Sequence, residues 1–183
     1  MSMKSVFCIA SNRIQAEQIV DQLRALGFSS NDISVLFPDK DTTRDFAHEK
    51  NTKAPEGIAT GAGTGGIVGG ALGWLAGIGA LAIPGAGPFI AAGPIMAALS
   101  GAAVGATVGG IAGGLIGMGI PELEAKRYEG KIKAGNILIS VHTENSEEIK
   151  AAERIFRKAG ASDICTTGES AAPKDKTAYA SGN

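Results

Sequence analysis

A long segment without charge divides this chain of 183 residues and decides its predicted fold. Residues 57–121 read GIATGAGTGGIVGGALGWLAGIGALAIPGAGPFIAAGPIMAALSGAAVGATVGGIAGGLIGMGIP and contain no Lys, Arg, Asp or Glu. Glycine recurs at every fourth position in two series: Gly57, Gly61, Gly65, Gly69, Gly73 and Gly77, then Gly101, Gly105, Gly109, Gly113 and Gly117. Residues 82–94 lie between the series and are rich in the proline and glycine typical of turns. The segment therefore predicts two long helices joined as a glycine-zipper hairpin over residues 57–120.

The glycine content decides where such helices could be stable. A glycine inside a helix in water costs about 1 kcal/mol relative to alanine, so the ten glycines from Gly57 to Gly79 would cost about 10 kcal/mol. In a bilayer the backbone must bond to itself, and small residues at four-residue spacing let helices pack closely. We therefore expect a transmembrane hairpin whose glycines mediate helix packing and oligomerisation, with lipid and other copies of the chain as partners. The alternative is a soluble homo-oligomer with the hairpin buried in its core.

The two sequences that flank this segment share one pattern. The predicted strands are residues 4–10, 33–37, 136–142 and 164–167, with a helix between the members of each pair. Each helix ends at a glycine, Gly27 or Gly160, and an Asp-Ile pair then leads into the next strand. Each flank is thus a split βαβ unit, and two such units make a ferredoxin-like sheet with two helices on one face.

The predicted domain is discontinuous, and its class is α+β. The segments are 1–38 for the first half of the ferredoxin-like domain, 39–56 for a charged linker, 57–120 for the hairpin, 121–135 for a short amphipathic helix, 136–168 for the second half and 169–183 for a disordered tail. Lys and Arg residues stand on both sides of the hairpin, and its turn has none. The positive-inside rule therefore predicts a bacterial inner-membrane protein with both termini in the cytoplasm. A cytoplasmic location is the alternative.

A run that follows the hairpin resembles a known family. Residues 119–122 read Gly-Ile-Pro-Glu, and Glu124-Ala125, Tyr128-Glu129 and the strand 137–141 come after them. Together with the glycine-rich hairpin, this run resembles the bacterial heat-induced general stress proteins of the YflT-like type, in versions with a long glycine-rich insert. The resemblance implies a stress-related protein without assigned catalytic residues.

Signals for catalysis, cofactors and metals are weak. Residues 61–66 fit the dinucleotide fingerprint, but no strand precedes them and no acid follows at the position that would bind ribose. His48 and His142 lack metal-ligand spacing with Cys8 or Cys165, and we expect both histidines at solvated or edge positions. The two cysteines fall on neighbouring predicted strands, which leaves open a redox pair or, as the favoured interpretation, two buried inert thiols.

Composition and pattern together narrow the function. A net charge of −1 gives no basic surface for nucleic acid, and we expect no enzymatic activity, cofactor or metal. The prediction is a membrane-associated, self-associating, stress-related protein whose hairpin anchors and oligomerises a cytoplasmic ferredoxin-like domain. The alternative is a module that senses a small ligand or a partner, in a soluble homo-oligomer with the hairpin in its core. A pore-forming function is the least favoured, because the predicted helices have no strongly polar face that would line a pore.

Overall fold

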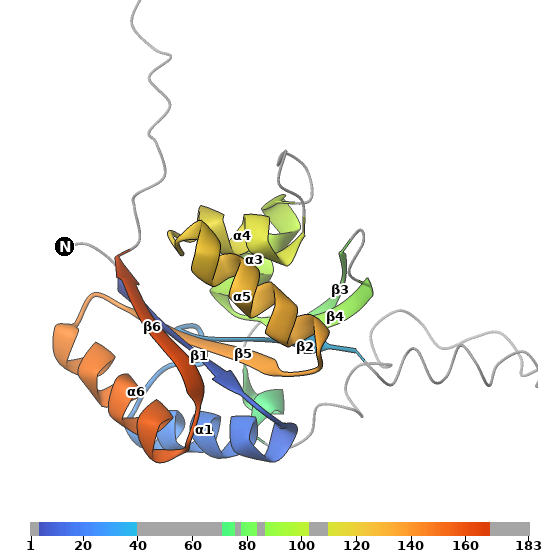
Figure 1. The fold of residues 1–183 in the computed structure, drawn as a ribbon. Coiled ribbons are helices and arrows are strands. Elements are labelled where there is room, and N and C mark those ends of the chain that lie inside the picture. The colour runs from blue at the N-terminus through green and yellow to red at the C-terminus, as the bar shows by residue number, and fades with distance from the viewer. Residues whose placement is uncertain (1–3, 40–70, 76–77, 84–86, 103–109, 169–183) are drawn as a thin grey trace, which may run out of the picture.

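A six-stranded antiparallel sheet forms the centre of the computed structural model (Figure 1). The structure describes residues 4–39, 71–75, 78–83, 87–102 and 110–168. Its strands are β1 (Lys4–Ala10), β2 (Ile33–Pro38), β3 (Gly79–Ile83), β4 (Gly87–Ala92), β5 (Ile137–Thr143) and β6 (Ser162–Gly168), in the order β3-β4-β2-β5-β1-β6. Its helices are α1 (Arg13–Ala25), the 3-10 turn η2 (Leu72–Trp74), α3 (Pro94–Ala102), α4 (Ile111–Gly117), α5 (Glu122–Lys133) and α6 (Ser146–Lys158).

The strands of the two flanks lie in the order β2-β5-β1-β6, which is the order that two split βαβ units produce. Val6 of β1 lies opposite Val141 of β5 on one side and opposite Thr166 of β6 on the other. Both flanking helices, α1 and α6, cover the same face of the sheet (Figure 1). The α+β class and the four predicted flanking strands are therefore confirmed.

Local sequence explains the two flanking helices. The side chain of Asn12 accepts a hydrogen bond from the backbone N–H of Gln15 at the start of α1, and Asn145 caps α6 in the same way. Both helices end before a glycine with positive φ, +92° at Gly27 and +74° at Gly160, a conformation that glycine adopts without strain. Apolar residues at helical spacing then face the sheet.

The described structure of the charge-free segment differs most from what the sequence predicts. Residues 79–83 and 87–92 are strands β3 and β4, whereas we expected the end of a helix and a turn there. β4 pairs with β2 and carries β3 on its other side. The apolar run Phe89–Ala92 is buried, and it gives the edge of β2 the hydrogen-bonding partner that a separate helical hairpin would not supply. The prediction of two long helices is therefore wrong for these residues.

The 3-10 turn η2 and the helices α3 and α4 also belong to this segment, and all three are short. Among the residues that the structure describes, no helix combines the length and apolar character needed to cross a membrane. Residues 57–70, 76–77, 84–86 and 103–109 of the predicted hairpin lie outside the described residues, as do most of the linker 39–56 and the tail 169–183. The short helix expected over residues 121–135 is confirmed as α5.

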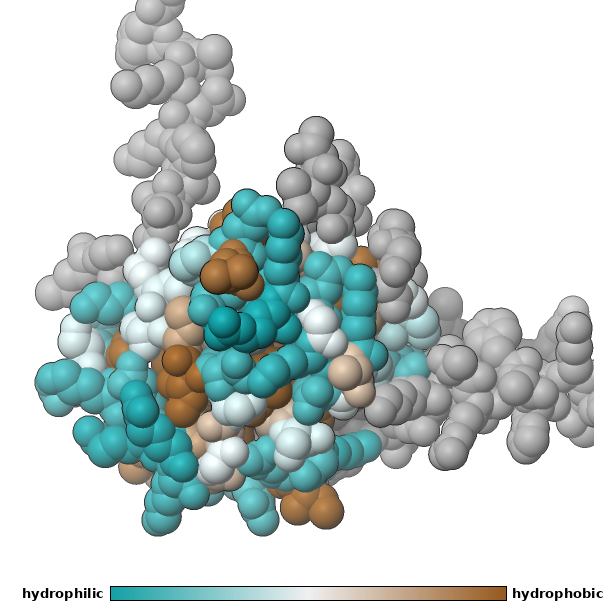
Figure 2. All heavy atoms as spheres, in the orientation of Figure 1, coloured by the Kyte–Doolittle hydropathy of each residue, from teal (hydrophilic) through white to brown (hydrophobic). Residues whose placement is uncertain are grey.

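Helices cover both faces of the sheet, which gives two apolar cores. Along β1 the side chains alternate: Val6 and Cys8 belong to the core beneath α1 and α6, and Phe7 and Ile9 to the core beneath α3, α4 and α5. The face that two βαβ units leave uncovered is thus buried by the insert and by α5. The view in Figure 2 is mostly hydrophilic, with apolar residues in separate areas. The large apolar side chains exposed among the described residues are Ile14, Leu26 and Leu123.

Candidate functional site

A buried histidine and three buried serines lie on the sheet face that α3 covers. His142 of β5 is 4% exposed, and Ser5, Ser34 and Ser140 have no exposed surface. Ser5 Oγ lies 2.8 Å from His142 Nδ1, while Ser140 Oγ and Ser34 Oγ lie 2.8 and 3.1 Å from Nε2. The prediction that His142 is solvated or at an edge is wrong, because β5 is an interior strand and hydroxyl groups satisfy both ring nitrogens.

This histidine–serine cluster also holds the start of α3. The backbone N–H of Ile95 donates to Ser34 Oγ over 3.2 Å, which satisfies one of the free N–H groups at the start of the helix. Gly93, just before α3, has a φ of +72°, and a Cβ at this position would lie 2.3 Å from the carbonyl oxygen of Ile33. Serine and histidine are groups used in nucleophilic catalysis, but these four side chains are buried. The cluster is therefore a structural network that ties the insert to the sheet.

A second polar group joins α5 to β6. The Tyr128 hydroxyl donates to the carbonyl oxygen of Asp163 over 2.6 Å, and the Asp163 carboxylate forms an ion pair with Lys131 and lies 3.9 Å from Arg127. Burial raises the pKa of the Asp163 carboxyl, but hydrogen bonds from Lys131 and Ser162 and the nearby positive charges outweigh it, so the pKa lies below its usual value. Burial, helped by neighbouring acidic groups, raises the pKa of Tyr128, which therefore remains a donor.

The two cysteines are free and belong to opposite faces of the sheet. Cys8 is buried beneath α1 and α6, whereas Cys165 packs against the core beneath α5. Cys165 lies opposite Phe7 in the register of β1 and β6. Burial raises the pKa of both thiols, which disfavours the reactive thiolate. The structure thus shows two separate thiols rather than a redox pair. The predicted burial is confirmed for Cys8, whereas Cys165 is only partly buried.

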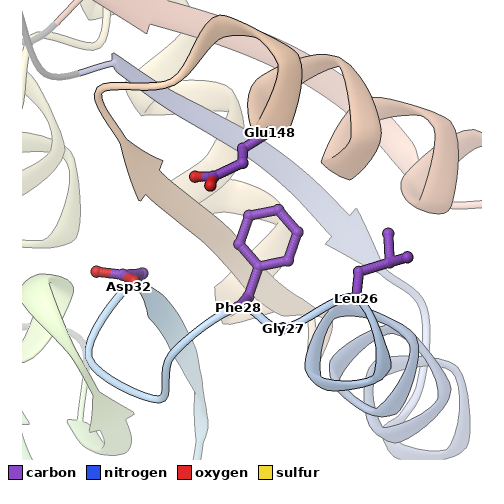
Figure 3. Close-up of a pocket in the computed structure, with 5 residues that line it drawn as sticks. All are labelled: Leu26, Gly27, Phe28, Asp32 and Glu148. Carbon is purple, nitrogen blue, oxygen red and sulfur yellow. The ribbon is translucent and has the colours of Figure 1, made fainter.

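A shallow hollow lies between the end of α1 and the start of α6 (Figure 3). Its lining residues are Leu26, Gly27, Phe28, Asp32 and Glu148. The Thr143 hydroxyl already donates to the Glu148 carboxylate. The described residues contain no group of three or more His, Cys, Asp or Glu side chains that could hold a metal ion. The hollow therefore offers two acidic groups but no assembled site.

The predicted packing glycines are only partly within the described residues. Gly57, Gly61, Gly65, Gly69, Gly77, Gly105 and Gly109 lie outside them, as do His48 and residues 61–66. Gly73 lies in η2, Gly101 in α3, and Gly113 and Gly117 in α4.

The close contact between α3 and α4 uses a glycine of neither series. A Cβ on Gly114 would lie 2.4 Å from Leu99 Cδ2 of α3, whereas a Cβ on Gly117 would have no atom within 4 Å. Gly117 is exposed on the single chain. The helix contact within the chain therefore depends on Gly114, and the role of the glycine series in oligomerisation stays a prediction.

The two edges of the sheet differ in how they are protected from pairing with another strand. β6 contains the charged Asp163, and its register with β1 shifts between Phe7 and Ile9, as at a β-bulge. Charges and bulges are the usual protection of an exposed edge. β3, at the other end of the sheet, reads Gly-Ala-Leu-Ala-Ile and pairs with β4 in an unbroken register from Gly79 to Ile83. The outer edge of β3 is thus uncharged and regular.

A comparison of the chain with protein-family models, with curated proteins and with solved structures finds no match.

Proposed function

We propose that the protein is a non-enzymatic, self-associating module, in which the charge-free insert completes a ferredoxin-like domain and joins copies of the chain into a homo-oligomer. The observation that carries the proposal is the sheet extension β3-β4. β4 buries its apolar residues against the domain, and β3 presents an uncharged strand edge that has no partner among the described residues. Such an edge favours the addition of another strand.

We propose no enzymatic role because the polar side chains that could act in catalysis are engaged inside the fold. His142 and its three serines are buried, the Asp163 carboxylate is held by Lys131, and the two thiols have raised pKa values. These side chains hold strands and helices of the domain together, and none of them lines the hollow between α1 and α6 in the described part of the chain. We therefore assign the protein a binding role.

A membrane-associated stress protein is the second candidate. It is supported by the absence of charge from residue 57 to residue 121, by the flanking Lys and Arg residues, and by the resemblance to the heat-induced general stress proteins. In this candidate, the protein is held at the bacterial inner membrane with both termini in the cytoplasm.

Fractionation followed by sizing separates the two candidates. The full-length protein at native level is extracted with carbonate and then with detergent, and its mass in solution is measured by sedimentation velocity. A discrete oligomer in the fraction that needs no detergent supports the proposed module. Retention in the membrane until detergent is added supports the second candidate instead. A monomer in the fraction that needs no detergent contradicts the proposed self-association.

A further inference from the structure

We propose that β3 is the surface through which two copies of this chain associate, by antiparallel pairing of β3 with β3 of the second copy about a twofold axis. The inference rests on the proposed self-association and specifies its surface and its partner. Two six-stranded sheets would join into one continuous sheet.

The first argument is the backbone of β3. One side of the strand is satisfied by β4, through pairs that run from Gly79 opposite Ala91 to Ile83 opposite Gly87. On the other side, no strand of the described residues forms hydrogen bonds with the outward N–H and C=O groups of β3, since β3 ends the sheet order. A regular edge of this kind is a template for one more strand.

The second argument is the contrast with β6, the other edge. β6 carries Asp163, whose carboxylate forms an ion pair with Lys131 beside the strand, and its pairing with β1 is irregular. Both features oppose the addition of a strand at that edge. β3 has neither a charge nor a register shift. Of the two edges, β3 is therefore the one able to pair.

The third argument concerns the partner. An antiparallel pair about a twofold axis brings the same residues together from both copies, so a charged edge would repel itself and an uncharged edge does not. Complete overlap of two five-residue strands places Leu81 opposite Leu81 of the second copy. Leu81 packs partly against the core beneath α3, and Ala80 is exposed and small. Neither residue blocks the approach, and a second copy fits the edge better than a charged partner.

The test places a charge on the edge without disturbing the core. Ala80→Lys introduces an ammonium group at an exposed position of β3, and Ala97→Lys is the matched control at an exposed alanine of α3 in the same charge-free segment. Sedimentation velocity of the full-length proteins over a range of concentrations gives the dissociation constant. We expect Ala80→Lys to raise it at least about tenfold and Ala97→Lys to leave it unchanged. Circular dichroism checks that both variants are folded.

A charge-swap mixture tests the twofold pairing itself. Ala80→Lys and Ala80→Glu should each dissociate alone and associate when mixed, because complete overlap brings the two positions 80 onto one face as diagonal neighbours. A mixture that stays monomeric contradicts this pairing. If the unchanged protein is an oligomer and Ala80→Lys has the same size, the edge inference is overturned while self-association stands. If the unchanged protein is a monomer, the proposed function fails as well.

Discussion

At the scale of single residues, His142 is the shared hydrogen-bonding partner of three buried serine hydroxyls. Its ring contacts Ser5 of β1, Ser34 of β2 and Ser140 of its own strand, so one side chain connects three strands. A buried hydroxyl that loses its partner costs about 1–3 kcal/mol. We expect His142→Leu to lower the free energy of unfolding by about 3 kcal/mol, measured by urea denaturation.

A combined variant separates lost hydrogen bonds from lost packing. Replacing both partners of a buried hydrogen bond by apolar groups is nearly neutral, unlike replacing one of them. His142→Leu together with Ser5→Ala and Ser140→Ala should therefore recover part of the lost stability. A combined variant that is less stable than His142→Leu alone would show that the serines stabilise the core by other contacts.

Asp163 makes the stability of the fold depend on pH. Because its pKa is lower in the folded protein than in the unfolded chain, the ionised carboxylate stabilises the fold above the unfolded pKa, and this contribution is lost as the pH falls through the folded pKa. We expect Asp163→Asn to reduce stability at neutral pH and to flatten the loss of stability between about pH 5 and about pH 2. Urea midpoints across this range measure both effects. Asp21→Asn, at an exposed position of α1, is the control, and an equal flattening there would contradict the assignment.

At the scale of elements, the packing of α3 on α4 depends on the absence of a side chain at Gly114. A Cβ there would overlap Leu99, whereas Gly117, one turn along the same helix, faces open space in the single chain. We expect Gly114→Leu to lower the free energy of unfolding by about 2 kcal/mol, because the core must move to accept the side chain. Gly117→Leu should be neutral or stabilising by up to about 1 kcal/mol, because leucine favours the helix.

The same pair of variants tests the predicted glycine zipper. Thermal unfolding gives the two stability changes, and sedimentation gives the size of each variant. Gly117→Leu should leave the oligomer unchanged if β3 forms the contact between copies. A smaller oligomer in a stable Gly117→Leu variant would instead support oligomerisation through the glycine series.

The elements that sequence could predict are those with strong local signals. Asn12, Asn145, Gly27 and Gly160 mark the ends of α1 and α6, and apolar periodicity marks the faces of these helices. The run Phe89–Ala92 has no such local signal, because glycine, alanine and proline surround it and its strand conformation depends on the edge of β2. The burial of His142 was missed for a related reason, since Ser5 and Ser34 approach it only after distant strands have paired. The one sequence signal that could have indicated this burial is the alternation of serine and apolar residues around His142.

At the scale of the whole molecule, the described parts of the apolar insert belong to the same folded unit as the sheet. β4 pairs with β2, Ser34 holds the start of α3, and α3, α4 and α5 bury the second face. The proposed self-association depends on this arrangement, because β3 reaches the edge of the sheet by pairing with β4. A hairpin detached from the domain would leave the second face of the sheet without the cover that α3 and α4 provide.

Amide hydrogen exchange of the full-length protein tests this arrangement most directly. Exchange from a stable sheet requires global unfolding, while a detached segment exchanges as fast as an unstructured chain. We expect the amides of Phe89, Ile90 and Ala91 in β4 to be protected to the same degree as those of Val35 and Leu36 in β2, with which this strand is paired. Rapid exchange throughout β4, with β2 and β5 still protected, would contradict the claim that the insert completes the fold.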